Sequence, residues 1–470
     1  MGSEVQAMYF EQFYLGCLAH ASYMFGSGGE AVVVDPQRDV EIYLERAAAE
    51  KLKIAHIFET HLHADFVSGH AELACRTGAK IYIGRESGAT FPHVGVSNGF
   101  ELRVGKCGIR VLQTPGHTVE SVCLLLTDYE RSPEPITVLT GDTLFIGDVG
   151  RPDLSKTLTP QQLAGMLYDS LHEKLLTLND AVRVYPAHGA GSLCGRNMRS
   201  ERSSTIGTER LTNPALQIAD RDAFIAELTH NLPSRPDYFL QDAEINRGGA
   251  EGLDQLPPLR ALSPAQVREM LQAGAVGLDV RPNETFAVGH VPGSINIALS
   301  GQFATWAGIA LGLHSDPVLM ADTDGQISEA RMRLARVGLD EVAGYLAGGV
   351  AAWRAAGHAL DSLPQMEPAE AAKHIDDPGW QILDVRRRGE WEDGHVEGAQ
   401  WAPLDDFRAG LPRLDRNKHI AVHCKGGYRS MIAASVLARE GYKVHNILGG
   451  FDRWRAERLP VAGTLATAKT

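Results

Sequence analysis

Metal-binding side chains cluster in one short stretch of this 470-residue chain. His61, His63 and Asp65 alternate there, directly after an apolar run at 54–58 that predicts a buried strand. Imidazole nitrogens and carboxylate oxygens are common ligands of transition metals. Because functional side chains are often carried on loops at strand ends, the stretch predicts a metal site. The next residue, Phe66, has no lone pair to offer a metal.

Three later loops carry the same kinds of side chain. His117, Asp142 and His188 each follow an apolar run that predicts a strand. The sequence therefore predicts that side chains from separate loops meet at one metal.

A second reactive group lies near the C-terminus, in the loop that begins at Cys424. A predicted strand at 420–423 leads into it, and a predicted helix follows. Backbone N–H groups of such a loop form an anion nest that favours a thiolate, and Lys425 and Arg429 add positive charge. Four residues separate Cys424 from Arg429, a shorter loop than cysteine phosphatases use for phosphate. The sequence predicts Cys424 as a sulfane-sulfur carrier, with Lys425 and Arg429 as catalytic partners.

The elements that position these groups divide the chain into four parts. Residues 1–235 read as a β-rich α/β domain, and the Pro- and Gly-rich segment 236–258 reads as a linker. Residues 259–360 and 361–470 read as two small α/β domains, in which short apolar strands alternate with helices. This alternation predicts a parallel sheet with helices on both faces in each small domain.

The two small domains are copies of one unit. Leu-Asp-Val-Arg at 278–281 recurs at 383–386, and the Gly-Gly pairs before Trp353 and Trp454 recur at a similar spacing. The first copy has Asp322 where the second has Cys424, and Ile327 where the second has Arg429. The first copy is therefore predicted to be inactive. It either docks the active copy or forms an interface in a homo-oligomer, and the sequence leaves both open.

Composition excludes some partners. The net charge is -13, which disfavours nucleic acid and anionic membrane surfaces, and no apolar run is long enough to span a bilayer. The first residues show no basic stretch followed by an apolar core, so we expect no secretory signal peptide. Six cysteines are scattered without paired spacing. That usage is typical of a reducing compartment and predicts a cytoplasmic protein.

The N-terminal loops, in their order along the chain, resemble the motifs of the metallo-β-lactamase superfamily. Two-zinc members of the glyoxalase II kind require His-x-His-x-Asp-His, and Phe66 stands where the last histidine would bind the second metal. The chain instead resembles the persulfide dioxygenases, which implies one Fe(II) in the N-terminal domain. The ligands that this resemblance implies are His61, His117 and Asp142.

The same resemblance gives roles to the remaining metal-type residues. It implies that His63, Asp65 and His188 support the ligands rather than bind iron themselves. The Cys424 loop and the repeated motifs resemble the rhodanese family. Together these resemblances imply an α/β chain: a metallo-β-lactamase αββα sandwich followed by two rhodanese-like domains with parallel sheets.

The implied reaction oxidises a low-molecular-weight persulfide, such as glutathione persulfide, with O₂ and water to a thiol and sulfite. The implied rhodanese reaction moves sulfur between a persulfide or thiosulfate and sulfite or a thiol. Fusion would raise the local concentration of one site's product at the other. The chain is thereby expected to act in sulfide or persulfide metabolism, as a persulfide dioxygenase and thiosulfate sulfurtransferase.

Candidates for substrate binding follow from residue type. Guanidinium groups suit the carboxylates or phosphates of glutathione or coenzyme A, although a solvated basic face and support of the metal loop are alternatives. Cys194 lies on a Gly-rich loop, where basic neighbours would favour a reactive thiolate. The candidate arginines are Arg151, Arg196, Arg199, Arg202 and Arg210.

Two other functions remain open on the sequence. One is a zinc thioester hydrolase of the glyoxalase II kind, against which Phe66 argues. The other is a non-enzymatic sulfane-sulfur carrier or sensor with a vestigial metal site.

Overall fold

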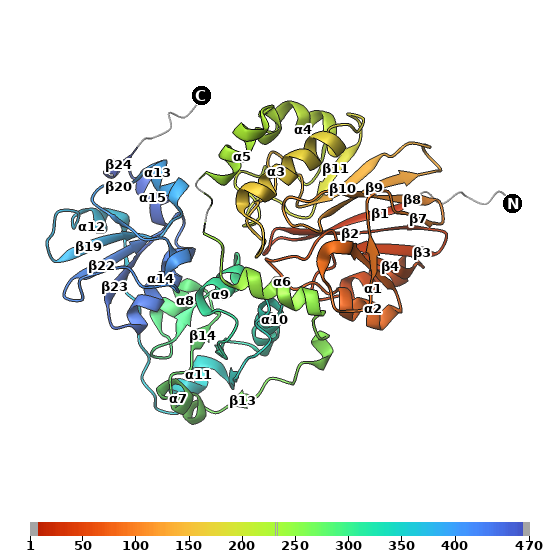
Figure 1. Cartoon of the computed structure of the whole chain (residues 1–470). Coiled ribbons are helices and arrows are strands. Elements are labelled where there is room, and N and C mark those ends of the chain that lie inside the picture. The colour runs from red at the N-terminus through yellow and green to blue at the C-terminus, as the bar shows by residue number, and fades with distance from the viewer. Residues whose placement is uncertain (1–7, 231, 233, 464–470) are drawn as a thin grey trace. The chain divides into compact units, whose positions relative to one another are not determined.

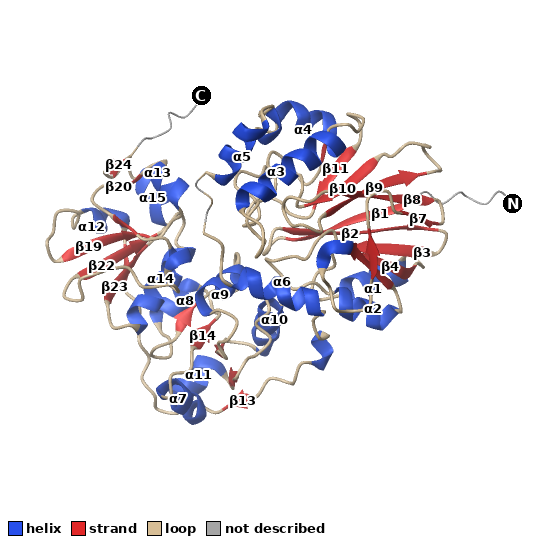
Figure 2. Cartoon of the chain, viewed as in Figure 1, coloured by secondary structure: helices blue, strands red, loops and turns tan. Residues whose placement is uncertain are grey.

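A computed structural model of the chain describes residues 8–230, 232 and 234–463. The chain forms two compact units. One comprises Met1–Leu256 with Ala335–Gly338, and the other Pro257–Leu334 with Leu339–Thr470. Figure 1 follows the chain by colour, and Figure 2 marks its helices and strands. Among the described residues, no helix has the length and apolarity needed to cross a membrane.

Two mixed sheets form the centre of the N-terminal unit. The strands of the first sheet follow chain order: β1 (Tyr9–Leu15), β2 (His20–Ser27), β3 (Glu30–Val34), β4 (Lys53–Phe58), β5 (Lys80–Gly84) and β6 (Val94–Val96). The second sheet runs from β12 back to β7: β7 (Glu101–Val104), β8 (Cys107–Gln113), β9 (Val122–Asp128), β10 (Thr137–Gly141), β11 (Arg183–Pro186) and β12 (Ser204–Thr205). Phe25 and Phe58 of the first sheet and Leu124 and Leu126 of the second belong to one buried cluster, so apolar faces pack between the sheets.

Helices cover the outer faces of both sheets. Tyr43 and Leu73, from α1 and α2, pack with the first sheet, and Leu167 and Phe224, from α3 and α5, pack with the second. Burying a side chain of this size contributes about 1.5–3 kcal/mol. The predicted αββα sandwich is therefore confirmed (Figure 2). The helices of this unit are α1 (Glu41–Ala49), α2 (His70–Thr77), α3 (Pro160–Ser170), α4 (Ile206–Thr212), α5 (Arg221–Thr229) and α6 (Tyr238–Gly248).

The predicted linker at 236–258 needs correction, because it contains helix α6. Tyr238, Phe239, Asp242 and Asn246 of this helix are buried, and the compact N-terminal unit continues to Leu256. The prolines and glycines that suggested a linker lie outside the helix or at its C-terminal end. They mark where α6 begins and ends, and they do not make the whole segment irregular.

Each half of the C-terminal unit contains a five-stranded sheet whose strand pairs are all parallel, as predicted. The first sheet has the order β13-β17-β16-β14-β15, and the second has the order β18-β23-β22-β19-β21. The first half contains β13 (Ala261–Leu262), α7 (Pro264–Gln272), β14 (Gly277–Asp279), α8 (Asn283–Val288), β15 (Ile295–Asn296), α9 (Phe303–Leu311), β16 (Val318–Met320), α10 (Asp324–Ala335), β17 (Gly344–Leu346) and α11 (Gly349–Ala355). The second contains β18 (Gln365–Met366), α12 (Pro368–Ala372), β19 (Trp380–Asp384), α13 (Arg388–Glu392), β20 (His395–Val396), β21 (Gln400–Trp401), β22 (His419–His423), α14 (Tyr428–Arg439), β23 (Lys443–Ile447), α15 (Gly450–Ala456) and β24 (Val461–Ala462).

The repeated Asp-Val-Arg motif is a structural device. In the second copy, Arg386 folds back on Asp384 with a shortest contact of 2.7 Å and donates to the Gly394 carbonyl at 2.8 Å. Arg281 makes the corresponding contacts with Asp279 and Gly289, at 2.6 and 2.9 Å. The buried arginine thus connects the end of a central strand to the segment after the next helix. The motif therefore has a structural role in both copies, including the one without the cysteine.

Candidate metal centre and sulfur-transfer loop

Three predicted ligands meet at one edge of the sandwich. His61 follows β4, His117 follows β8, and Asp142 follows β10, so the strand ends determine their positions. The Nε2 atoms of His61 and His117 lie 3.8 and 3.3 Å from Asp142 Oδ2. These side chains are buried. Each offers one ligand atom, and the three ligand atoms lie within 4.8 Å of one another. Such spacing is compatible with one metal ion held between the three groups.

Hydrogen bonds orient both imidazoles toward this point. His117 Nδ1 lies 3.0 Å from the Arg151 carbonyl, which can only accept, so Nδ1 carries the proton. Thr60 gives its hydroxyl proton to Asp35 at 2.8 Å and therefore accepts from His61 Nδ1 at 3.0 Å. In both rings the lone pair is left on Nε2, the atom that faces Asp142.

The charge states of the three groups fit a divalent metal. Burial lowers the pKa of His61 and of His117, so both rings are neutral and can bind a metal. Burial opposes ionisation of Asp142, but His188 and His117 outweigh it and lower its pKa. His117 Nε2 and Asp142 Oδ2 are buried without a hydrogen-bond partner. Because buried polar atoms normally have a partner, these two are suited to bind an ion.

His188 supports the carboxylate of this set. Its Nδ1 donates to Asp142 Oδ1 at 2.7 Å, and its Nε2 lies 3.0 Å from Asp65 Oδ2. Burial disfavours the imidazolium, but the carboxylates of Asp142 and Asp65 outweigh burial and raise the pKa of His188 well above its ordinary value. The charged ring holds Asp142 with its second oxygen toward the two neutral histidines.

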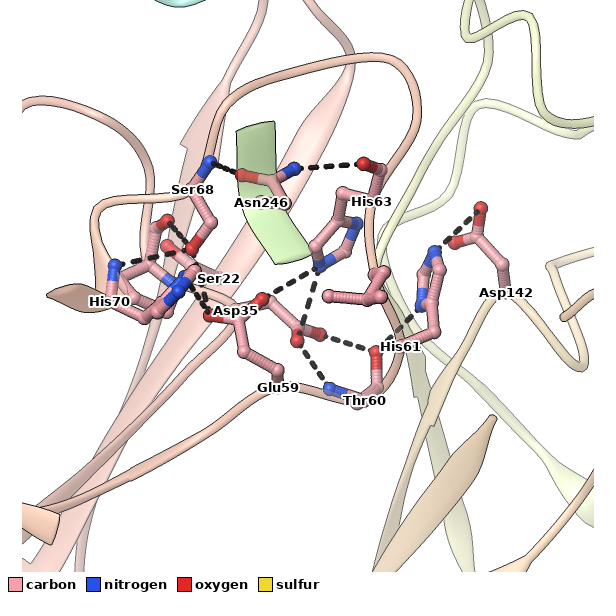
Figure 3. A network of polar contacts seen from close by, with 12 residues as sticks. Ser22, Asp35, Glu59, Thr60, His61, His63, Ser68, His70, Asp142 and Asn246 are labelled. Carbon is pink, nitrogen blue, oxygen red and sulfur yellow. Dashed lines mark hydrogen bonds and ion pairs between the residues drawn. The ribbon is translucent and has the colours of Figure 1, made fainter. Parts of the chain in front are cut away.

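His63 faces a different set of acidic groups. Its Nε2 lies 3.2 Å from Asp35 Oδ1 and 3.7 Å from Glu59 Oε2, and its carbonyl accepts a hydrogen bond from Asn246 at 2.8 Å (Figure 3). Asn246 Nδ2 also donates to the Phe66 carbonyl, and Oδ1 accepts from the Ser68 amide. The loop that carries the metal-type residues is thus held by α6. Sequence reasoning missed Asn246, because it fell in the predicted linker.

The Phe66 ring occupies the space beside the remaining histidines. It is fully buried, with its centroid 4.1 Å from that of His20 and 4.4 Å from that of His63. The ring centroid of His188 lies 6.4 Å from that of Phe66. An apolar ring therefore fills the position from which a histidine would have to bind a second metal.

The candidate arginines all have protein partners. Arg151 pairs with Asp153 at 2.6 Å and donates to the Leu193 carbonyl, which supports the metal loop. Arg196 donates to the carbonyls of Glu227 and Leu228, Arg199 pairs with Glu209, Arg202 lies over the Tyr14 ring, and Arg210 pairs with Asp180. Arg151 and Arg196 also line a pocket of about 300 Å³. Substrate binding by these residues stays a prediction.

Cys194 differs from its expected state. Its side chain is buried near Asp142 and His188, and the basic neighbours foreseen from the sequence do not dominate. Burial, followed by the carboxylates of Asp65 and Asp142, raises the pKa of Cys194 well above its ordinary value. These surroundings favour the protonated thiol rather than the expected thiolate, and a functional role for Cys194 stays a prediction.

The Cys424 loop connects β22 to α14 in the second copy. Gly427, with φ of 107°, turns its N–H toward Cys424 Sγ at 3.1 Å. The Phe451 amide donates to the Cys424 carbonyl at 2.7 Å. A Cβ on Gly450 would lie 2.4 Å from that carbonyl oxygen, so only glycine allows this close approach. The repeated Gly-Gly motif thus holds the reactive loop in place.

The basic residues of the loop have different surroundings. Lys425 is exposed, whereas Arg429 binds Glu390 through two hydrogen bonds of 2.6 and 2.7 Å. In the first copy the aligned Asp322 is half exposed and Ile327 is buried. The first copy therefore has neither the thiol nor the arginine brace.

Comparison with known proteins agrees with this architecture. Residues 15–188 match the metallo-beta-lactamase superfamily, and residues 263–356 and 367–457 match the rhodanese-like domain. The mitochondrial persulfide dioxygenase ETHE1 of Mus musculus is 32% identical over 221 residues, which cover 45% of this chain and 77% of that protein. A hydroxyacylglutathione hydrolase of Francisella tularensis subsp. novicida is 33% identical over 177 residues, covering 37% of this chain and 65% of that protein.

The match to one solved structure extends beyond the N-terminal domain of this chain. The crystal structure of a metallo-beta-lactamase from Staphylococcus aureus subsp. aureus COL is 33% identical, with a TM-score of 0.66, and the match covers 73% of this chain and 99% of that one. The chain belongs to the metallo-β-lactamase superfamily, as a homologue of the persulfide dioxygenases whose N-terminal domain is fused to two rhodanese-like domains.

Proposed function

We propose that the N-terminal domain is an Fe(II)-dependent persulfide dioxygenase and that the second rhodanese-like domain is a sulfurtransferase. The observation that carries the first assignment is the convergence of two neutral imidazoles and one carboxylate on a buried point, with Phe66 beside them. The homology to persulfide dioxygenases supports a role in sulfur metabolism. The overall reaction would be R-S-SH + O₂ + H₂O → R-SH + SO₃²⁻ + 2 H⁺.

In this proposal the protein supplies the geometry of the metal centre. Bound Fe(II) would supply the electrons that O₂ activation needs and open positions for the reactants. Arg151 and Thr60, through His117 and His61, direct two lone pairs inward. His188 fixes the carboxylate of Asp142. The buried side chains around these ligands keep bulk water away, which strengthens their electrostatic contacts with substrate.

In the sulfurtransferase, Cys424 is the nucleophile. Its thiolate attacks the outer sulfur of thiosulfate, the S–S bond breaks, and sulfite leaves with the bonding electron pair. Gly427 donates its N–H to the sulfur, and Arg429 with Glu390 keeps the loop closed. The resulting Cys424 persulfide passes its sulfane sulfur to a thiol or to sulfite. Sulfite would be a product of the N-terminal site and a substrate of this one.

We place the substrates among low-molecular-weight thiol persulfides such as glutathione persulfide, and the protein in the cytoplasm. A zinc-dependent thioester hydrolase is the second candidate, because a hydroxyacylglutathione hydrolase is 33% identical over part of the chain. Phe66 argues against it, since the two-zinc pattern has a histidine at this position.

The deciding experiment measures O₂ consumption by the iron-loaded protein with several persulfides, and quantifies sulfite and thiosulfate. We expect O₂ uptake with sulfite production. Stoichiometric zinc, thioester cleavage and no O₂ uptake would instead establish the hydrolase. Cys424→Ser should abolish thiosulfate sulfurtransferase activity and leave O₂-dependent sulfite production intact, because the two chemistries use separate residues. Loss of both activities in a folded variant would contradict this separation.

A further inference from the structure

A pocket lies where the two rhodanese-like copies meet, within the C-terminal unit. Its volume is about 610 Å³, and both copies contribute to its wall. The first copy supplies α8, including Glu284 and Val288, and the second supplies the Cys424 loop through Gly426 and Gly427. Asn283 of α8 donates to the Gly427 carbonyl at 3.4 Å, so α8 lies against the start of α14 (Figure 1).

This pocket is connected to the reactive sulfur through one residue. Gly427, which lines it, is the residue whose N–H contacts Cys424 Sγ at 3.1 Å. A Cβ at Gly426 would meet no atom within 4 Å, so the loop borders open space there. A molecule that occupies the pocket therefore touches the loop that holds the sulfur, and it also contacts α8 of the copy without a cysteine.

One polar side chain that lines this pocket, Asn446, has an acceptor without a hydrogen-bond donor. Asn446 is 3% exposed, and its Oδ1 has no hydrogen-bond partner. The orientation of this amide follows from its neighbour: Gln365 Nε2 donates to the Leu363 carbonyl, so Gln365 Oε1 must accept from Asn446 Nδ2, at 2.9 Å. The buried Oδ1 of Asn446 is thus a hydrogen-bond acceptor without a donor. Leaving such a buried atom without a hydrogen bond costs about 1–3 kcal/mol of stability.

The charged side chain that lines the pocket is negative. Glu284 contributes a carboxylate, and no lysine or arginine is present among the described residues that line the pocket. Sulfite and thiosulfate are anions and would gain nothing from this environment. A ligand with an ammonium group would pair with Glu284 and could donate to Asn446 Oδ1.

We propose that this pocket binds the thiol that accepts sulfur from Cys424, and that it selects thiols bearing an amino group. The proposal rests on the proposed function, in which Cys424 carries the sulfane sulfur. The acceptor thiolate attacks the terminal sulfur of the Cys424 persulfide, and a new S–S bond forms on the acceptor. The S–S bond to Cys424 breaks, and its electron pair returns to Sγ as a thiolate. No external oxidant or reductant is required. The first copy, which lacks the cysteine, then helps to determine which thiol the second copy accepts.

The test compares three acceptors of similar size with the full-length protein and thiosulfate as donor: cysteamine, 2-mercaptoethanol and 3-mercaptopropionate. Their rates are expressed per thiolate, because their thiol pKa values differ. We expect kcat/KM to fall in that order, with about a tenfold difference between the first and the last. Loading, the transfer of sulfur from thiosulfate to Cys424, is measured separately. It is followed as the sulfite released in a single turnover without a thiol acceptor.

Two variants of the first copy sharpen the test. Glu284→Gln should lower kcat/KM for cysteamine several-fold and leave 2-mercaptoethanol and loading unchanged. Val288→Lys places a cation at a residue that is 84% exposed, and should reverse the order of cysteamine and 3-mercaptopropionate. Glu269→Gln, at an exposed position on α7 outside the lining, is the matched control and should behave as wild type.

Two outcomes would overturn the assignment, and they are distinguishable. Normal loading with equal rates for all three acceptors, unaffected by Glu284→Gln and Val288→Lys, would remove the pocket from the reaction while leaving Cys424 as the sulfur carrier. Absence of sulfite release by the wild-type protein would remove the sulfurtransferase function and, with it, the acceptor site.

Discussion

Glu390 holds the guanidinium of Arg429 through two hydrogen bonds, to one carboxylate oxygen at 2.6 Å and to the other at 2.7 Å. Glu390 belongs to α13, and Arg429 closes the Cys424 loop at the start of α14. The sequence predicted this arginine as a positive charge that favours the thiolate of Cys424. In the structure its donors are directed at a carboxylate, which makes it a brace between a helix and the reactive loop.

Removing this carboxylate should destabilise the C-terminal unit. The side chains of Arg429 and Glu390 are 15% and 30% exposed, so Glu390→Gln leaves a largely buried cation without its counter-ion. We expect a loss of about 2 kcal/mol in the free energy of unfolding. All six tryptophans lie between residues 306 and 454, so tryptophan fluorescence during urea denaturation reports this unit.

The neighbouring ion pair gives a matched control. Arg388 and Glu392, also on α13, are 62% and 57% exposed. Glu392→Gln should change the free energy of unfolding by less than about 0.5 kcal/mol, because an exposed pair is screened by water. Equal effects of the two substitutions would show that Arg429 does not depend on its partner.

The contribution of Glu390 should disappear in acid. Burial opposes its ionisation, but the hydrogen bonds and charge of Arg429 outweigh burial and lower the pKa of Glu390 below its ordinary 4.5. A carboxyl whose pKa is lower in the folded state contributes stability above its unfolded pKa and loses it as the pH falls through its folded pKa. The difference in unfolding free energy between wild type and Glu390→Gln should be constant near neutral pH and shrink below about pH 4.5. A difference that persists to pH 3 would contradict this origin.

Metal binding should depend on the charge of Asp142. Asp142→Asn keeps the size of the side chain and an oxygen for His188, but it removes the charge that faces His61 and His117. We expect at least about a tenfold loss of iron affinity, measured as metal retained after dialysis by elemental analysis. His314→Gln, an exposed histidine of the C-terminal unit, should retain the wild-type content. Full metal content in Asp142→Asn would exclude Asp142 as a ligand.

Phe66 should determine how many metal ions the domain holds. Asp65 Oδ2 and His188 Nε2 already lie 3.0 Å apart beside the ring, so Phe66→His would add the histidine of the two-zinc pattern next to them. We expect zinc stoichiometry to rise from about one to about two per chain in titrations followed by elemental analysis. Phe66→Leu keeps an apolar side chain and should remain at one. A single zinc in Phe66→His would mean that the surrounding loop, and not residue 66 alone, excludes the second ion.

Some features of this protein follow from local sequence. Alternating apolar runs predict the strands, and the recurrence of Asp-Val-Arg with a Gly-Gly pair predicts two copies of one fold, because such patterns depend on spacing along the chain. The same holds for Cys424, since a thiol between a strand and a helix is placed by its immediate neighbours. The identity of Asp322 and Ile327 likewise predicts, without any structure, that the first copy lacks a sulfur carrier.

Other features depend on residues that are far apart in sequence. Asn246 reaches the carbonyls of His63 and Phe66 from a helix that read as a linker, and Glu390 takes the guanidinium of Arg429. Burial, followed by the carboxylates of Asp65 and Asp142, raises the pKa of Cys194 and outweighs the charge of Arg151. The sequence by itself determined the residue types, the strand ends and the repeat that make both sites possible. Only the tertiary structure decided which buried groups face one another, because hydrogen bonds, desolvation and charge coupling act through space and not along the chain.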